Sequence, residues 1–138
     1  MTIDEALRAH LTSAASAAAV TALIGTRMYP DQVPQKPTLP CIGYAVLEGE
    51  QDTTHDGLSG YMETTFELVC MAKDRLAAKD LAQKVKLALD AFPAVMGGAG
   101  GVEVDGVFVT GERNDFDDEL RVYWTILDVL IEHEAPTA

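Results

Sequence analysis

The fold of this chain is decided by the stretch from Leu120 to Glu132, which reads Leu-Arg-Val-Tyr-Trp-Thr-Ile-Leu-Asp-Val-Leu-Ile-Glu. Side chains along a β-strand point alternately to opposite faces of the sheet. One face would carry Leu120, Val122, Trp124, Ile126, Asp128 and Leu130, and the other Arg121, Tyr123, Thr125, Leu127, Val129 and Ile131. Both faces are largely apolar and need cover. Because a short chain has few helices for two covering layers, we expect part of that cover from another subunit.

Asp128 is the one carboxylate within this apolar strand. A buried carboxylate must be paired or neutral. Its partner is either a backbone group or an arginine of the same chain, or a group across a subunit boundary. The first alternative is favoured, since buried polar groups usually find their partners within their own chain.

The composition indicates an ordinary globular protein. The chain has 138 residues, 48% of them hydrophobic and 23% charged, and we expect one domain over residues 1–138. No run approaches the roughly 20 apolar residues that a membrane-spanning helix needs. The N-terminus has acidic residues where a secretory signal is positively charged, which predicts a cytoplasmic protein with Cys41 and Cys70 as buried thiols. The net charge of −12 argues against a nucleic-acid reader, which needs a basic patch.

The apolar periodicity and the turn residues predict four strands and two helices. The two expected helices run from a capping box at Thr2 to a C-terminal cap at Gly25 and over Asp74–Phe92. The first three expected strands cover Cys41–Glu48, Tyr61–Ala72 and Val102–Glu112, and the stretch from Leu120 is the fourth. The expected connections are an extended proline-rich segment over Met28–Pro40, a long loop over Gly49–Gly60, a glycine-rich span over Gly97–Gly101 and an acidic turn over Arg113–Asp118. At Asp105-Gly106 a bulge is preferred to a hairpin turn, because the hairpin would have a very short first arm. We therefore predict an α+β fold, an antiparallel four-stranded sheet with two helices packed on one face, in the order α-β-β-α-β-β.

The motifs that usually carry chemistry are missing from the sequence. The segment around Ser59 lacks the glycine spacing of a hydrolase nucleophile elbow and precedes a strand rather than a helix. The Gly97–Gly101 tract has neither phosphate-loop nor dinucleotide spacing. The three histidines have no zinc-ligand spacing, and the acidic residues 115–118 do not form a calcium loop. We predict no catalytic, cofactor-binding or metal site, hence no enzyme.

The chain resembles the tail-completion family of long-tailed bacteriophages, small proteins that terminate the tail tube and join it to the head. The resemblance spans nearly the whole chain, and its pieces are Ala6–Leu11, Leu23–Pro30, Pro34-Gln35, Leu39–Tyr44, Asp56–Gly60, Leu81–Asp90 and Glu112–Asp115. It implies a structural protein of a phage or prophage virion, without enzymatic activity or cofactor. It also implies an α+β subunit that assembles into a ring, usually a hexamer, at the neck end of the tail. That ring would end tube polymerisation.

The partners implied by the resemblance are further copies of the chain, the tail-tube protein and the head connector or a neck protein. No specific nucleic-acid or membrane partner is expected, and assembly would take place in the host cytoplasm. A ring needs a heterologous contact. We predict that this subunit interface uses Tyr61, Val69, Tyr123, Leu127 and Val129, helped by Met28 and Tyr29. We predict that tube or connector contacts use the loop residues Gly49, Asp52, His55, Asp56, Gly57, Gly98 and Gly100.

Two alternatives stay open. A head-side neck adaptor or another minor tail protein would have the same size and acidity. A small-molecule-binding or hydrolytic domain would use Cys41, Cys70 or Ser59, but no base lies at a spacing that activates any of them.

Overall fold

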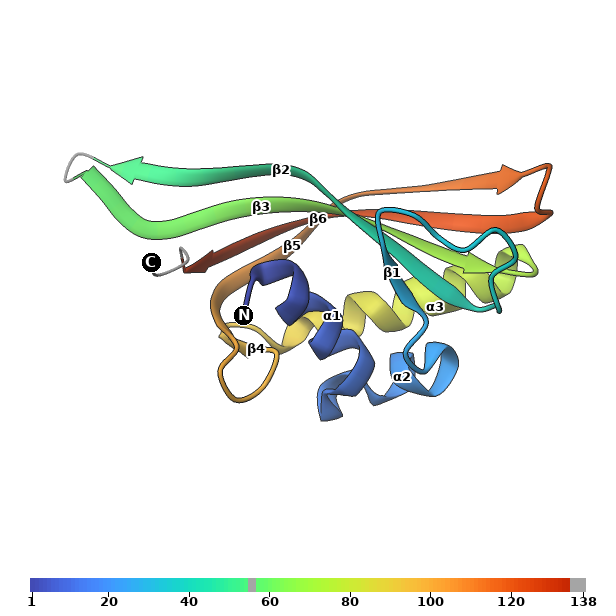
Figure 1. Ribbon diagram of the computed structural model, residues 1–138, viewed down its shortest axis with the longest axis horizontal. Helices are drawn as coiled ribbons and strands as arrows, with labels where there is room; N and C mark the ends of the chain where they lie inside the picture. The colour runs from blue at the N-terminus through green and yellow to red at the C-terminus, as the bar shows by residue number, and fades with distance from the viewer. Residues whose placement is uncertain (55–56, 135–138) are drawn as a thin grey trace.

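The structure is a computed structural model that describes residues 1–54 and 57–134. Its elements along the chain are α1 (Ile3–Ser13), α2 (Ala18–Ile24), β1 (Met28–Pro30), β2 (Cys41–Thr54), β3 (Gly57–Ala72), α3 (Arg75–Ala88), β4 (Ala94–Met96), β5 (Val102–Asp117) and β6 (Val122–Glu134). Short 3₁₀ helices at Ala15–Ala17 and Leu89–Ala91 follow α1 and α3. The strands form one curved sheet, and the helices lie together on one side of it (Figure 1).

The sheet is larger than predicted and is mixed. Its strand order is β1-β2-β3-β6-β5-β4, with β1 parallel to β2 and all other neighbours antiparallel. The predicted antiparallel four-stranded sheet with two helices was wrong, because the described residues form a six-stranded half-barrel with three α-helices. Both additional strands are three-residue edge strands, too short for a readable alternation. Pro30 ends β1 at the sheet edge, where its missing N–H costs no ladder hydrogen bond.

The main core lies between the sheet and the helices. Phe66 and Leu68 of β3 and Leu127, Val129 and Ile131 of β6 point into it, at the two-residue spacing of strands. The helices contribute their apolar stripes, which include Leu7, Leu11, Val20, Ile24, Leu81 and Val85. Fully burying one such large side chain stabilises the fold by about 1.5–3 kcal/mol, so this layer contributes most of the stability.

The helix starts follow the sequence prediction. Thr2 caps α1 in a capping box, in which its side chain accepts from the Glu5 backbone N–H and the Glu5 side chain accepts from the Thr2 N–H. Asp74 caps α3, and its carboxylate accepts the Ala77 N–H at 2.7 Å. Both first turns are therefore fixed by local hydrogen bonds.

The N-terminal helix was expected to be continuous, but it is broken after α1. Ala14 leaves the helical region with φ −70° and ψ 145°. The hydroxyls of Thr12 and Ser13 donate to the carbonyls of Arg8 and Ala9 at 2.7 and 2.6 Å, and such bonds bend helices. Among the described residues, no single helix is long and apolar enough to cross a bilayer. α1 and residues 15–24 together have the required length and composition, but the two segments are bent by 66°.

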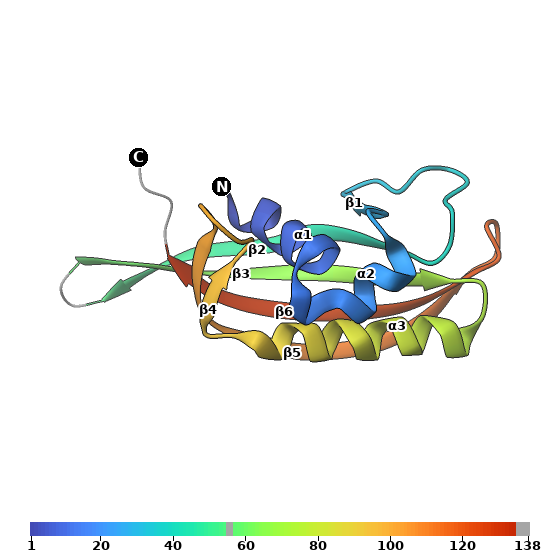
Figure 2. The same ribbon diagram turned by 90° about the horizontal axis from the view of Figure 1, so that it is seen from below.

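Two long hairpins replace two predicted loops. β2 and β3 pair out to Thr54 and Gly57, so most of the predicted loop over residues 49–60 forms hairpin arms. A polar composition does not exclude a strand, because the backbone alone makes the ladder hydrogen bonds. Likewise, β5 extends to Asp117, so the predicted turn over residues 113–118 is mostly strand. Figure 2 shows the β2–β3 hairpin projecting past the helices at one end, with the β5–β6 turn at the other.

The predicted bulge at Asp105-Gly106 is confirmed. β5 is one strand over Val102–Asp117, and its register with β6 shifts between Val104 and Gly106. A second shift lies between Val109 and Gly111. Bulges increase local twist, which is how this long strand follows the curvature of the sheet.

Candidate interaction surface

The sheet face opposite the helices, here called the helix-free face, is the leading candidate for contacts with other molecules. Because Phe66, Leu68 and Leu127 point to the helices, the residues that alternate with them point away. These are Glu67, Val69 and Met71 of β3, Trp124, Ile126, Asp128 and Leu130 of β6, and Phe108 and Arg113 of β5, which pair with β6. Phe108 is 50% exposed. The face therefore combines apolar side chains with charge.

An ion-pair cluster joins three strands on this face. Arg113 donates from Nη2 to Glu67 Oε2 at 2.8 Å and from Nη1 to Asp128 Oδ2 at 3.1 Å. Glu67 and Asp128 are direct ladder partners, so the guanidinium separates two like charges. The prediction that Asp128 pairs within its own chain is confirmed. Its Oδ1 is buried and has no hydrogen-bond partner in the described part of the chain.

Near the β5–β6 turn, the helix-free face is hollowed into what we call the acidic groove, about 440 Å³ in volume. Its apolar lining comes from the sheet, from residues 33–34 and from the turn, and comprises Val33, Pro34, Gly43, Ala45, Val69, Met71, Leu120 and Trp124. Four carboxylates stand among the lining residues: Asp31, Glu67, Asp117 and Glu119. The groove thus offers an apolar interior with a strongly negative border.

The proline-rich segment after β1 forms one wall of the acidic groove. The Asp31 N–H donates to the Tyr44 carbonyl at 2.8 Å, with Asp31 in the left-handed region at φ 58°. Val33 then packs toward Met71, and a Cβ on Gly43 would lie 2.9 Å from Val33 Cγ2. Only glycine at position 43 permits this close approach. This wall was not predicted, although Val33 is an aliphatic residue among prolines.

The β5–β6 turn forms the facing wall. Asp117 Oδ1 accepts the N–H groups of Glu119 and Leu120 at 2.9 and 3.0 Å, which fixes the turn. Trp124 Nε1 is buried with no hydrogen-bond partner among the described residues. The described residues that line the groove include no histidine, cysteine, serine or lysine. Its chemistry suits an apolar side chain flanked by cations.

Three residues of the predicted subunit interface lie inside the subunit. Leu127 and Val129 are 0% exposed under the helices, and Met28 is 1% exposed in the same core. Placing them on an outer surface was therefore wrong. The alternation of β6 shows which residues share a face of the strand. It does not show which of the two faces packs against the helices.

The other predicted interface residues are placed differently. Val69 is half-buried in the acidic groove, and Tyr29 packs against the small buried cluster of Cys41, Met71 and Val122. Tyr123 points to the helix-bearing face, where its ring lies 4.6 Å from that of Phe116. Tyr61 belongs to β3, but its side chain is outside the described part of the structure. The interface itself stays a prediction.

The predicted contact loops fall into two places. Gly49 and Asp52 lie in β2 and Gly57 begins β3, whereas His55 and Asp56 lie outside the described residues. Gly98 and Gly100 lie between β4 and β5 with φ 77° and 76°, a conformation that glycine adopts without strain. Their role in tube or connector contacts stays a prediction.

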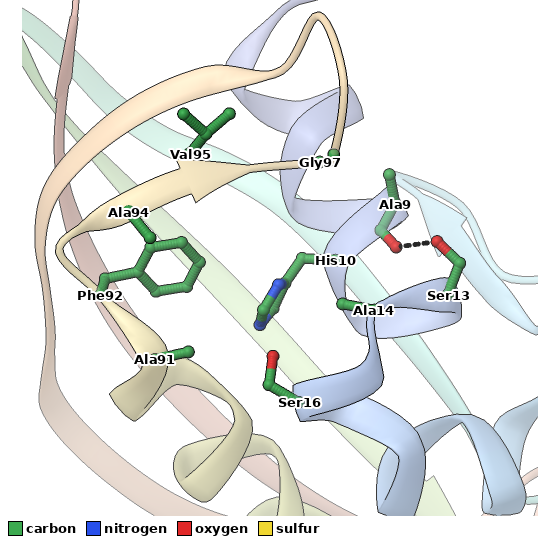
Figure 3. A pocket seen from close by; sticks show the side chains of 11 residues that line it. Ala9, His10, Ser13, Ala14, Ser16, Ala91, Phe92, Ala94, Val95 and Gly97 are labelled. Atoms are coloured by element: carbon green, nitrogen blue, oxygen red, sulfur yellow. Dashed lines mark hydrogen bonds between the residues drawn. The ribbon is translucent and has the colours of Figure 1, made fainter.

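A second cavity, of about 320 Å³, lies between the end of α1 and the segment around β4 (Figure 3). His10 Nε2 donates to the Ala88 carbonyl at 2.8 Å, and its ring packs 4.9 Å from that of Phe92. Ser13 donates to the Ala9 carbonyl rather than to the histidine. His10 therefore ties α1 to the end of α3. Among the described residues, no group of three side chains could hold a metal ion.

His133 is a second buried histidine, 2% exposed. Its Nδ1 lies 2.8 Å from the Glu134 carbonyl and its Nε2 lies 2.8 Å from Thr64 Oγ1. A carbonyl can only accept, so Nδ1 carries the proton and Nε2 accepts from the threonine. Burial lowers the pKa of His133, which favours this neutral form.

The cysteines and Ser59 show no activated nucleophile. Burial raises the pKa of Cys41 to about 11 and that of Cys70 to about 12, so both stay thiols at neutral pH. Ser59 lies within β3 and not between a strand and a helix. These positions give no support to the hydrolytic alternative.

Comparisons with family models and with solved structures both give matches. A family model described as "Tail completion protein gp17" matches residues 5–134. No curated protein sequence matches the chain. Among solved structures, the chain is similar to one in "Virion of native gene transfer agent (GTA) particle", with a TM-score of 0.61 and 17% identity over 94% of this chain and 92% of that chain. At this identity the structural likeness concerns the fold.

Proposed function

Because the chain belongs to the family of tail completion proteins described as gp17, we propose that it caps the phage tail tube as an oligomeric, usually hexameric, ring. This ring ends tube polymerisation and joins the tail to the head. The family membership itself gives the coarser statement: the chain is a structural protein of virion assembly that interacts with other virion proteins.

The observation that carries the proposal is the acidic groove on the helix-free face. All described helices cover the other face, so this face keeps half-buried Val69 and Trp124 and exposed Phe108 without a helical layer. A ring requires a patch that docks on a different patch of the next copy. A hollowed, apolar and charged face is the kind of surface that such a contact needs.

Two further features support a position at the end of a tube. The β2–β3 hairpin extends past the helices (Figure 2), and the Gly98 to Gly100 segment lies at the same end of the sheet as that hairpin. Projecting hairpins and glycine-bearing loops are common contact elements, so we assign them to tube or connector contacts. The net charge of −12 suits a ring through whose lumen DNA passes without binding.

The test combines self-association with tube capping. The purified protein, alone and with the tail-tube protein, is followed by light scattering and electron microscopy. We expect a discrete ring, free or on tube ends, and tubes that stop growing once capped. A strict monomer at high concentration, with tubes that elongate unchanged, contradicts the proposal. Binding to the head connector but not to tube ends would instead identify a head-side neck adaptor.

A further inference from the structure

Half of the basic side chains of this acidic protein lie on α3 or just before it. Of ten Lys and Arg residues in the chain, five fall within residues 73–86. Two of them have partners: Lys84 pairs with Asp80 and Lys86 pairs with Glu112. The remaining three, Lys73, Arg75 and Lys79, are exposed at the start of α3 and form no ion pair with any described residue.

These three cations lie within three residues of an exposed leucine, Leu76, and the carboxylates of Asp74 and Asp80 also stand beside it. Leu76 lies in the first turn of α3 and is 79% exposed, more than any other large apolar side chain in the described part of the chain. Asp74 caps this turn, so the leucine projects from a fixed backbone. We call Lys73, Arg75, Leu76 and Lys79 the basic knob. Asp74 is engaged in the helix cap and Asp80 in the pair with Lys84, so the unpaired charges near Leu76 are positive. An exposed apolar side chain with unpaired cations nearby is a favourable surface for an acidic partner.

The acidic groove matches the basic knob in both chemistry and charge. The groove offers Val69 and Trp124 to an apolar side chain, and Asp31, Asp117 and Glu119 to cations. None of these three carboxylates forms an ion pair with a described residue. Each surface therefore lacks within its own subunit what the other supplies.

The positions of the two surfaces require different copies to meet. α3 packs on the helix-bearing face, whereas the groove is on the helix-free face, and Figure 1 shows the start of α3 and the β5–β6 turn at the same end of the molecule. Two different patches on opposite faces give a head-to-tail contact, which is the kind of contact that a ring needs. A twofold dimer would need both knob–groove pairs to form between the same two copies, which patches on opposite faces of one subunit do not allow.

We propose that the basic knob of one copy docks into the acidic groove of the next copy and forms the repeating contact of the assembly. This inference rests on the proposed ring. Leu76 enters between residue 33 and the β5–β6 turn, and Lys79 pairs with the border carboxylate of Glu119. The occupant of the groove is thus a second copy of this chain.

The first test replaces the centre of the knob. Leu76→Asp removes the apolar anchor and adds a repelling charge, and it should weaken self-association by at least about 30-fold. Leu87→Asp is the matched control, because Leu87 is 61% exposed on the same helix about three turns further along. Both variants should keep the wild-type circular dichroism spectrum and melting cooperativity. Rings of Leu76→Asp with wild-type stability would overturn the proposal.

The second test exchanges charges across the contact. Lys79→Glu and Glu119→Lys should each weaken assembly by about tenfold, whereas an equimolar mixture should form alternating rings. The double variant Lys79→Glu/Glu119→Lys should assemble by itself. Absence of rescue in both the mixture and the double variant would overturn the pairing of these two residues.

The outcomes separate this contact from the proposed function. If the wild type neither forms rings nor caps tubes, the proposed function fails. If it caps tubes and Leu76→Asp does so equally well, the ring stands and the knob–groove contact is wrong. If Glu119→Lys keeps its rings but loses tube binding, the groove faces the tube protein, which also overturns this inference.

Discussion

The ion-pair cluster on the helix-free face should contribute to the free energy of unfolding. In Arg113→Met, the aliphatic stem stays and the guanidinium is lost. The contacts at 2.8 Å to Glu67 and 3.1 Å to Asp128 disappear. The two carboxylates then lie directly opposite each other on β3 and β6 without a cation between them.

The expected cost is moderate, because the cluster is partly exposed. The side chains of Arg113, Glu67 and Asp128 are 52%, 29% and 28% exposed. Partly exposed pairs contribute about 0.2–1 kcal/mol each. Like charges facing each other across two strands cost about 0.2–1 kcal/mol more. We expect Arg113→Met to lower the free energy of unfolding by about 1–2 kcal/mol, or the melting temperature by about 3–8 °C.

The assay is urea unfolding at low and at high salt, where screening should reduce the difference from wild type. Adding Glu67→Gln to Arg113→Met removes the facing charge and should restore about 0.5 kcal/mol. Lys84→Met is the control, since Lys84 pairs with Asp80 on the exposed side of α3 and should cost less than about 0.5 kcal/mol. A loss for Arg113→Met no larger than for Lys84→Met would show that the ion-pair cluster does not stabilise the sheet.

Three further predictions concern the core, pH and one glycine. Leu127→Ala should cost about 2–5 kcal/mol in urea unfolding, because Leu127 is 0% exposed; a cost below about 1 kcal/mol would contradict its placement. Burial lowers the pKa of His133 in the folded state. At pH values just below about 6.5, the usual pKa of histidine, the unfolded state therefore binds more protons than the folded state. The free energy of unfolding should therefore fall as pH is lowered from 6.5 to 5, by at most about 1.4 kcal/mol per pH unit from this group, and His133→Gln should show a shallower fall. Gly97→Ala should destabilise more than Gly98→Ala, since a Cβ at 97 would lie 3.1 Å from Ala6 Cα while one at 98 meets nothing within 4 Å; equal melting temperatures would contradict this.

The sequence alone predicted the elements that have a long pattern or a local signal. The helix predicted over Asp74–Phe92 has a long apolar periodicity, and the structure contains it as α3 over Arg75–Ala88, followed by the 3₁₀ turn at Leu89–Ala91. The bulge at Gly106 and the partner of Asp128 within its own chain were also predicted correctly. Periodicity, capping and the need to pair a buried charge act over a few residues or within one chain, so they can be read from the sequence.

The edges of the sheet and the buried face of each strand are set by long-range packing. β1 and β4 have three residues each, too few for any alternation, and they exist because the longer strands beside them offer unpaired backbone groups. The sequence of β6 is apolar on both faces of the strand. Long-range packing alone places Leu127 in the core and Trp124 in the groove. The acidic groove depends on three distant segments, so its residues could not be grouped before the chain was folded.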